Sequence, residues 1–143
     1  MSIGSIHHVA IVVGSIDDAL PRYRDLFGLE PEAPPMTFVP QRVRLCFLPT
    51  GPAPAAQLEL VEPVDDESGV ARFLAARGEG VHHVCFLTDD LPASLEALAA
   101  AEAELIDREP RAGAHGTVAF VHPRTLNGVL WELLEVAPGT NEG

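Results

Sequence analysis

Several features that mark particular protein classes are scarce or missing in this 143-residue sequence. It contains no lysine, its nine basic residues are all arginine, and 21 acidic residues give it a formal net charge of −12. A surface that contacts nucleic-acid phosphates needs the opposite charge, so we predict no nucleic-acid partner. The two cysteines, Cys46 and Cys85, lie in apolar stretches, which indicates buried thiols rather than a disulfide.

Long apolar runs are absent as well. No stretch approaches the ~18 to 20 consecutive apolar residues that cross a bilayer, and the first residues lack a basic segment followed by an apolar one. We therefore predict a cytoplasmic protein with no membrane partner. The hydrophobic content of 47% is enough for a packed core, and the length suits one domain covering residues 1–143.

What the sequence does contain is an internal repeat. The stretch IHHVAIVVGSIDDAL, which begins at Ile6, resembles VHHVCFLTDDLPASL, which begins at Val81, at an offset of 75 residues. Two more pairs follow at offsets of 74 and 73 residues, VRLCFLP with TVAFVHP and LELVE with WELLE. The small drift in offset indicates two copies of one structural unit.

Each copy has the pattern of a strand, a helix and three more strands. The first copy predicts a helix from a cap within 15–18 to about residue 26, and strands at 6–13, 37–39, 43–48 and 57–61. The second predicts a helix over about 91–103, and strands at 82–88, 105–107, 118–122 and 129–136. We expect an α+β fold of two tandem βαβββ modules, about 6–63 and 81–136, joined by a helix within about 68–78.

Four polar residues occupy repeat-related positions inside these strands. They are His8 with His83 and Glu59 with Glu132. Imidazole and carboxylate groups are costly to bury without partners, and two nitrogen and two oxygen donors can hold one divalent cation. The pattern predicts such a site but does not choose between His7 and His8, because the residues on both faces of that strand are apolar.

At this level of detail the sequence resembles the vicinal oxygen chelate superfamily and, within it, the methylmalonyl-CoA epimerases. The resemblance spans roughly residues 6–136 and rests, beyond the paired HHV strands, on YRDLFGLE, LELVEP, DDESGVARFLAARGEGVHHV, PRAGAHGTVAFVHP and GVLWELLE. It implies a cupped mixed sheet around a metal site, an acyl-CoA substrate and a homodimer. It also implies one divalent cation, which we expect to be Co²⁺, Mn²⁺, Ni²⁺, Zn²⁺ or Mg²⁺.

The resemblance also implies roles for individual residues. The ligand histidine of the superfamily directly precedes Val, which selects His8 and His83, and the remaining ligands fall on Glu59 and Glu132. Their neighbours His7 and His82 are then structural. Glu132 is both ligand and catalytic base, in an epimerase that interconverts the C2 stereoisomers of methylmalonyl-CoA, or of a close alkylmalonyl-CoA, through a metal-stabilised enolate.

Three further residues are predicted to contact the substrate, namely Arg44, His115 and Gly116. Some epimerases carry a second catalytic Glu on the strand at 43–48, where this sequence has Arg44, with Arg42 two residues earlier on the same face. Arginine stays protonated and cannot act as a base, so we expect Arg44 to hold an anionic part of the substrate.

Two other functions are compatible with the same residues. A glyoxalase I-like lactoylglutathione lyase would use the same four ligands, and a metal-free small-molecule binding or resistance protein could have the same fold. The stretches that begin at Asp65 and Pro110 favour the epimerase, and four intact ligands argue against the metal-free protein.

Overall fold

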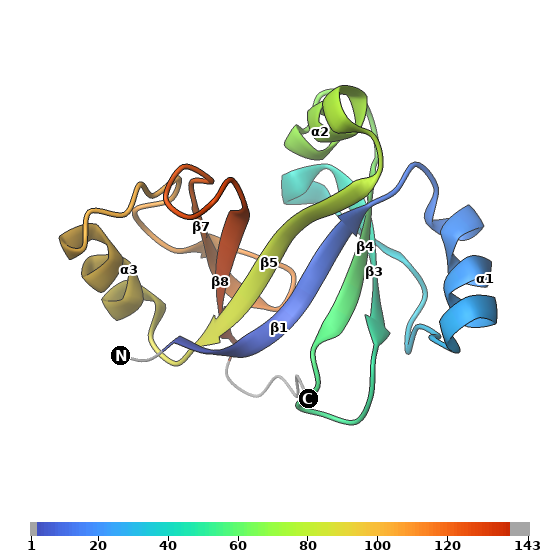
Figure 1. Cartoon of the computed structure of the whole chain (residues 1–143), viewed down its shortest axis with the longest axis horizontal. Helices are drawn as coiled ribbons and strands as arrows, with labels where there is room; N and C mark the ends of the chain where they lie inside the picture. Colours follow the sequence, from blue (N-terminus) through green and yellow to red (C-terminus); the bar gives the residue numbers. More distant parts are fainter. Residues whose placement is uncertain (1–2, 138–143) are drawn as a thin grey trace. The chain divides into compact units, whose positions relative to one another are not determined.

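The computed structural model describes residues 3–137, which form two compact units (Figure 1). The N-terminal unit consists of residues 9–82, and the C-terminal unit consists of the described residues before 9 and after 82. The division falls inside the two HHV segments, within β1 (Ile3–Val12) and β5 (Gly80–Thr88), and not between the modules expected from the sequence. Each unit therefore contains part of both strands.

The N-terminal unit is a sheet with two α-helices. Its strand order is β2–β3–β4–β1, in which β2 (Met36–Phe38), β3 (Val43–Pro49) and β4 (Gln57–Pro63) are antiparallel. Helix α1 (Ile16–Phe27) covers one face, where its residues form a core with side chains from β3, β4 and the segment after β1: Val13, Ile16, Cys46, Leu48 and Leu60. A 3₁₀ helix, η1 (Val39–Gln41), and α2 (Gly69–Arg77) complete the unit.

The C-terminal unit has core side chains on both faces of its sheet. Its strand order is β1–β5–β8–β7–β6, with β5 parallel to β8 (Leu130–Val136), and with β7 (Gly116–Val121) antiparallel to both β8 and β6 (Arg111–Ala112). Helix α3 (Leu91–Ala100) packs on one face through Leu91 and Leu95. The opposite face carries a second cluster that includes Cys85, Phe120 and Leu134.

Most of the predicted elements are confirmed, including the order βαβββ in both copies. Ser15, Ser68 and Asp90 cap the three helices, and Gly28 ends α1 in the left-handed conformation at φ 70°. Since Ser15 is the cap, Pro21 lies inside α1 and not in its first turn. None of the described helices is long and apolar enough to cross a membrane.

The prediction of a strand at 105–107 is wrong. This segment forms a single bridge, between Leu105 and Val121, and the strand next to β7 lies later, at Arg111–Ala112. The carboxylate of Asp107 accepts a hydrogen bond from the backbone N–H of Phe120 at 2.8 Å. The backbone N–H of Phe120 thus donates to a side-chain oxygen instead of to a strand carbonyl. The hydrogen-bond ladder between 105–107 and β7 therefore does not extend beyond one bridge.

Each copy contains the same kind of long-range contact at the start of its first helix. Glu62 accepts a hydrogen bond from the backbone N–H of Ile16 at 2.7 Å, and Glu135 accepts one from Leu91 at 2.7 Å. Both carboxylates come from the last strand of their copy and satisfy a free N–H at a helix N-terminus, where negative charge is favourable. This recurrence supports the two-copy interpretation with tertiary contacts.

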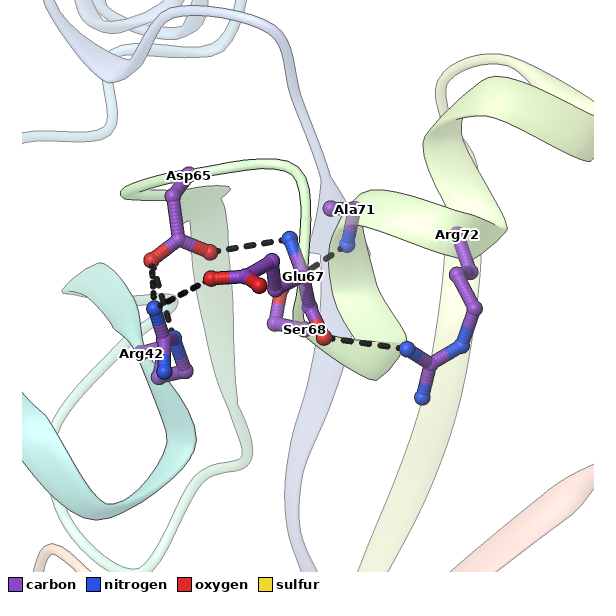
Figure 2. A network of polar contacts seen from close by, with 6 residues as sticks. All are labelled: Arg42, Asp65, Glu67, Ser68, Ala71 and Arg72. Atoms are coloured by element: carbon purple, nitrogen blue, oxygen red, sulfur yellow. Dashed lines mark hydrogen bonds and ion pairs between the residues drawn. The ribbon is translucent and has the colours of Figure 1, made fainter.

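An ion-pair network holds the acidic loop between β4 and α2 (Figure 2). Arg42 donates to Asp65 at 2.8 Å and to Glu67 at 2.9 Å, and Asp65 accepts the backbone N–H of Glu67 at 2.9 Å. The hydrogen bond from Arg42 holds the pKa of Asp65 below its ordinary value. The strand alternation predicts that Arg42 and Arg44 share one face of a strand. This prediction is wrong, because Arg42 ends η1 at φ 57° and lies outside β3.

Candidate metal centre

Three of the four predicted ligands meet in the C-terminal unit. Nε2 of His8 and Nε2 of His83 are 3.3 Å apart, and each lies 3.1 Å from Oε1 of Glu132. All three side chains are buried, with at most 9% of any side chain exposed. The structure therefore brings together two histidines and a carboxylate whose positions in the sequence are far apart.

The spacing of these three atoms suits a shared cation. A divalent transition metal lies about 2.0 to 2.2 Å from nitrogen and oxygen ligands, so neighbouring ligand atoms are about 2.9 to 3.5 Å apart in octahedral or tetrahedral coordination. The three separations fall in that range. Buried Oε1 of Glu132 also accepts no hydrogen bond of good geometry from the described residues. Such an atom, between two imidazole nitrogens, has the environment of a metal ligand.

Strand register positions Glu132 beside the histidines. Glu132 is the partner of Cys85 on β5 and of Phe120 on β7. His83 is two residues before Cys85 and therefore points to the same face of the sheet, opposite α3. The ring of Phe120 packs edge-on against His83, with centroids 5.6 Å apart. Cross-strand neighbours thus hold both the carboxylate and the imidazole in place.

Electrostatics keep Glu132 ionised. Burial raises the pKa of a carboxyl group, but the adjacent rings of His8 and His83 lower the pKa of Glu132 by more, to well below its ordinary value. The carboxylate form is the one that can bind a cation or accept a proton.

A second group of ligand atoms lies on the other side of the His8 ring. His7, His8 and Cys85 also have ligand atoms within 4.8 Å of one another. Here Nδ1 of His7 is 2.8 Å from Nδ1 of His8, which is a hydrogen-bond distance. We therefore interpret this group as support for the His8 ring, which leaves Nε2 as its ligand atom.

Glu59 belongs to the N-terminal unit. It lies within β4, is 7% exposed and has Phe47 as its partner on β3. Its neighbours Leu58 and Leu60 pack with the α1 core, so Glu59 points to the other face of the sheet. A buried carboxylate on the face opposite the α1 core has the character of a ligand, and its role as the fourth one stays a prediction.

Arg44 is held by acidic side chains on the α1 face of the N-terminal sheet. Arg44 lies on the α1 face of β3, like Cys46, and not on the face of Glu59. Its guanidinium contacts Glu62 at 3.4 Å and Asp17 at 3.8 Å. Those two acids balance its charge, which favours a structural role, and its contact with an anionic substrate group stays a prediction.

His115 and Gly116 border a pocket of about 500 Å³ in the C-terminal unit, formed by the segments 112–117 and 135–137. A Cβ on Gly116 would lie 2.1 Å from the backbone oxygen of Glu135, so close packing of β7 on β8 by itself requires glycine there. His115 is partly buried, and its ring centroid is 5.9 Å from that of His7. The predicted substrate contact thus has a pocket beside it.

Sequence reasoning missed two residues that shape the site. Phe120 carries no signal beyond being an apolar strand residue, and its contact with His83 depends on the β7–β8 register. His7 was assigned a structural role, although it is hydrogen-bonded to a predicted ligand. Its signal was its position next to His8, but the strand alternation expected there would have pointed the two rings to opposite faces.

Comparisons with known proteins agree with this geometry. Residues 7–120 match the family model of the glyoxalase/bleomycin resistance protein/dioxygenase superfamily. The chain is 36% identical over 137 residues to the ethylmalonyl-CoA/methylmalonyl-CoA epimerase of Cereibacter sphaeroides, covering 94% of this chain and 99% of that protein. It is 41% identical over 131 residues to the uncharacterized protein YqjC of Bacillus subtilis, covering 91% of each.

Solved structures give the same result. A variant of Streptomyces coelicolor methylmalonyl-CoA epimerase in complex with 2-nitronate-propionyl-CoA has a TM-score of 0.89 and 33% identity, covering 95% of this chain and 99% of that one. Family match, sequence relatives and structural neighbour all extend over most of the chain. This protein therefore belongs to the glyoxalase/bleomycin resistance protein/dioxygenase superfamily and is similar over nearly its whole length to the methylmalonyl-CoA epimerases.

Proposed function

We propose that this chain is a metal-dependent epimerase of methylmalonyl-CoA or of a closely related alkylmalonyl-CoA. The observation that carries the proposal is the buried cluster of His8, His83 and Glu132, with ligand atoms 3.1 to 3.3 Å apart. Relatives named as methylmalonyl-CoA epimerases support the substrate class. We propose Glu59 as the fourth ligand. Mixed nitrogen and oxygen donors accept Co²⁺, Mn²⁺, Ni²⁺, Zn²⁺ or Mg²⁺.

A divalent cation held by these residues would act as a Lewis acid toward substrate oxygens and stabilise the negative charge that develops as the C2 proton leaves. The protein residues supply the proton transfer. The C2 hydrogen of methylmalonyl-CoA is acidic because it lies between a thioester and a carboxylate. Glu132 is the carboxylate that accepts this proton, on the face of C2 that it overlooks. Burial of the cluster limits access of water to it.

The substrate's acyl-CoA portion requires space beside the metal centre. We propose that the pocket next to His115 receives part of it, because this pocket is in the same unit as the three ligands and is bordered by the turn at 113–116. With Arg44 on the α1 face, another group returns the proton on the opposite face of C2. We also propose that the protein is a homodimer, which analytical ultracentrifugation would test.

Deuterium exchange tests the proposal most directly. The metal-loaded protein is incubated with one stereoisomer of methylmalonyl-CoA in deuterated water, and label at C2 is followed by mass spectrometry together with loss of optical purity. We expect both signals in the loaded protein and neither after chelation. A glyoxalase I-like enzyme would instead isomerise the hemithioacetal of glutathione and leave C2 unlabelled, which would overturn the proposal.

A further inference from the structure

His7 is buried directly against the proposed ligand His8. Each residue is only 4% exposed, their Nδ1 atoms are 2.8 Å apart, and the rings meet edge-on with centroids separated by 5.0 Å. A nitrogen–nitrogen separation of this length is a hydrogen bond, so one of the two Nδ1 atoms carries a proton and the other accepts it.

Which ring carries that proton determines whether His8 can bind a metal. If His8 donates from Nδ1, its neutral ring has a free lone pair on Nε2, the atom next to His83 and Glu132. If His7 donates instead, neutral His8 carries its proton on Nε2 and cannot be a ligand through that atom. Metal-binding histidines generally donate their second ring N–H to a neighbouring acceptor, which fixes tautomer and orientation.

We propose that His7 is a positioning residue of the metal centre, whose Nδ1 accepts the hydrogen bond from Nδ1–H of His8 and so keeps Nε2 of His8 directed at the cation. This inference rests on the proposed function, because it concerns the same metal site. His7 also has a second ring nearby, since the centroids of the His7 and His115 rings are 5.9 Å apart.

In the second HHV copy, the repeat-related histidine has different aromatic surroundings. His82 is the repeat-related counterpart of His7, and its ring packs edge-on against Phe73 of the N-terminal unit, with centroids 4.9 Å apart. The ring of His83 is packed against Phe120. An aromatic ring therefore contacts the ligand histidine His83, whereas the ligand histidine His8 donates a hydrogen bond to a second histidine, His7.

Cobalt binding by three variants separates this role from a general structural one. His7→Phe keeps an aromatic ring but removes the acceptor, His7→Asn retains an oxygen near the position of Nδ1, and His82→Phe is the matched control. Affinity for Co²⁺ is measured by competition with a chelator, and the visible spectrum of the bound cobalt reports its ligand geometry. Circular dichroism verifies that each variant folds.

We expect His7→Phe to bind one Co²⁺ per chain with about 10- to 100-fold lower affinity and an altered cobalt spectrum. His7→Asn should restore most of the affinity, and His82→Phe should bind as the unchanged protein does. Equal affinity of His7→Phe and the unchanged protein would overturn the role of His7 alone. Failure of the unchanged protein to bind cobalt would overturn the metal site and, with it, this inference.

Nitrogen NMR of the unchanged protein provides a test that does not depend on any variant folding. With diamagnetic Zn²⁺ bound, long-range proton–nitrogen spectra should show His8 protonated at Nδ1 and His7 protonated at Nε2. A metal-loaded protein in which His7 is protonated at Nδ1 and donates to His8 would overturn the proposal.

Discussion

The two compact units differ in how they bury ionisable side chains: the C-terminal unit buries several of them together, and the N-terminal unit buries Glu59. The C-terminal unit buries His8, His83 and Glu132 together, with their ligand atoms within 3.3 Å of one another. In the N-terminal unit, Arg24, Arg42 and Arg44 pair with acids in exposed or partly exposed positions. Buried charge is costly and surface ion pairs contribute little, so the buried cluster is the feature that stability does not explain. Function is the better explanation.

The HHV copies show the same contrast at single-residue scale. His7 and His82 have identical neighbours in sequence, HV, but His7 is hydrogen-bonded to a ligand and His82 packs on Phe73. Both copies have a strand at the HHV segment. The different neighbours of His7 and His82 in the fold give these two histidines different contacts. Substitutions in the two units test these contrasts, beginning with the largest expected effect.

Replacing the carboxylate of the cluster should have the largest effect. Glu132→Gln keeps an oxygen that can bind the cation but removes the base, so we expect C2 deuterium exchange to fall by about 10³-fold. Metal content, measured by plasma mass spectrometry, should stay close to one ion per chain. Exchange at the original rate in a metal-loaded Glu132→Gln protein would show that another residue removes the proton.

The second comparison concerns adjacent histidines. His83→Ala removes a ligand, and we expect affinity for Co²⁺ to fall by more than about 10²-fold, beyond the loss typical of a residue that only supports a ligand. His82→Ala should leave affinity unchanged, because its ring packs on Phe73. A larger loss from His82→Ala than from His83→Ala would reverse the assignment of the ligand histidine.

The third comparison concerns glycines of the two units. A Cβ at Gly116 would collide with the Glu135 backbone oxygen, whereas a Cβ at Gly51 would make an ordinary contact of 3.7 Å with Ala55. We expect Gly116→Ala to lower the free energy of unfolding by about 1 to 3 kcal/mol and Gly51→Ala to change it by less than about 0.5 kcal/mol. Urea denaturation measures both, and equal stabilities would contradict the close packing.

The fourth comparison tests the contact that the two copies share. Glu62→Gln and Glu135→Gln each remove a charge from a helix N-terminus, so we expect each to lower the free energy of unfolding by about 0.3 to 1 kcal/mol. Urea denaturation should give similar losses for the two variants. A loss in only one of them would mean that the contact stabilises one copy alone.

The smallest effect is expected at Arg44. Its side chain lies on the α1 face with Glu62 and Asp17, so Arg44→Ala should change the KM for methylmalonyl-CoA by no more than about twofold. Steady-state kinetics measure this. A tenfold rise in KM would instead support the predicted contact between Arg44 and the substrate.

Local sequence determined most of the secondary structure. The sequence predicts a helix within about 68–78, and α2 occupies 69–77 with Ser68 as its cap, because a cap and an apolar periodicity act within a few residues. The βαβββ repeat could be predicted for the same reason, since turns and strand patterns are short-range signals. The prediction at 105–107 was wrong because Asp107 uses its side chain to bind the backbone of Phe120, a contact with a residue 13 positions away.

Sequence alone also determined which residue types were candidates for the metal site, since His8, His83, Glu59 and Glu132 stand at repeat-related strand positions. Only the tertiary structure decided what surrounds them. The β5–β8 register sets Glu132 beside the histidines, strand β3 turns Arg44 toward Glu62, and a hydrogen bond joins His7 to His8. Residue spacing within one strand does not encode these contacts, because each depends on strand pairing or on the rotamer that a buried ring adopts.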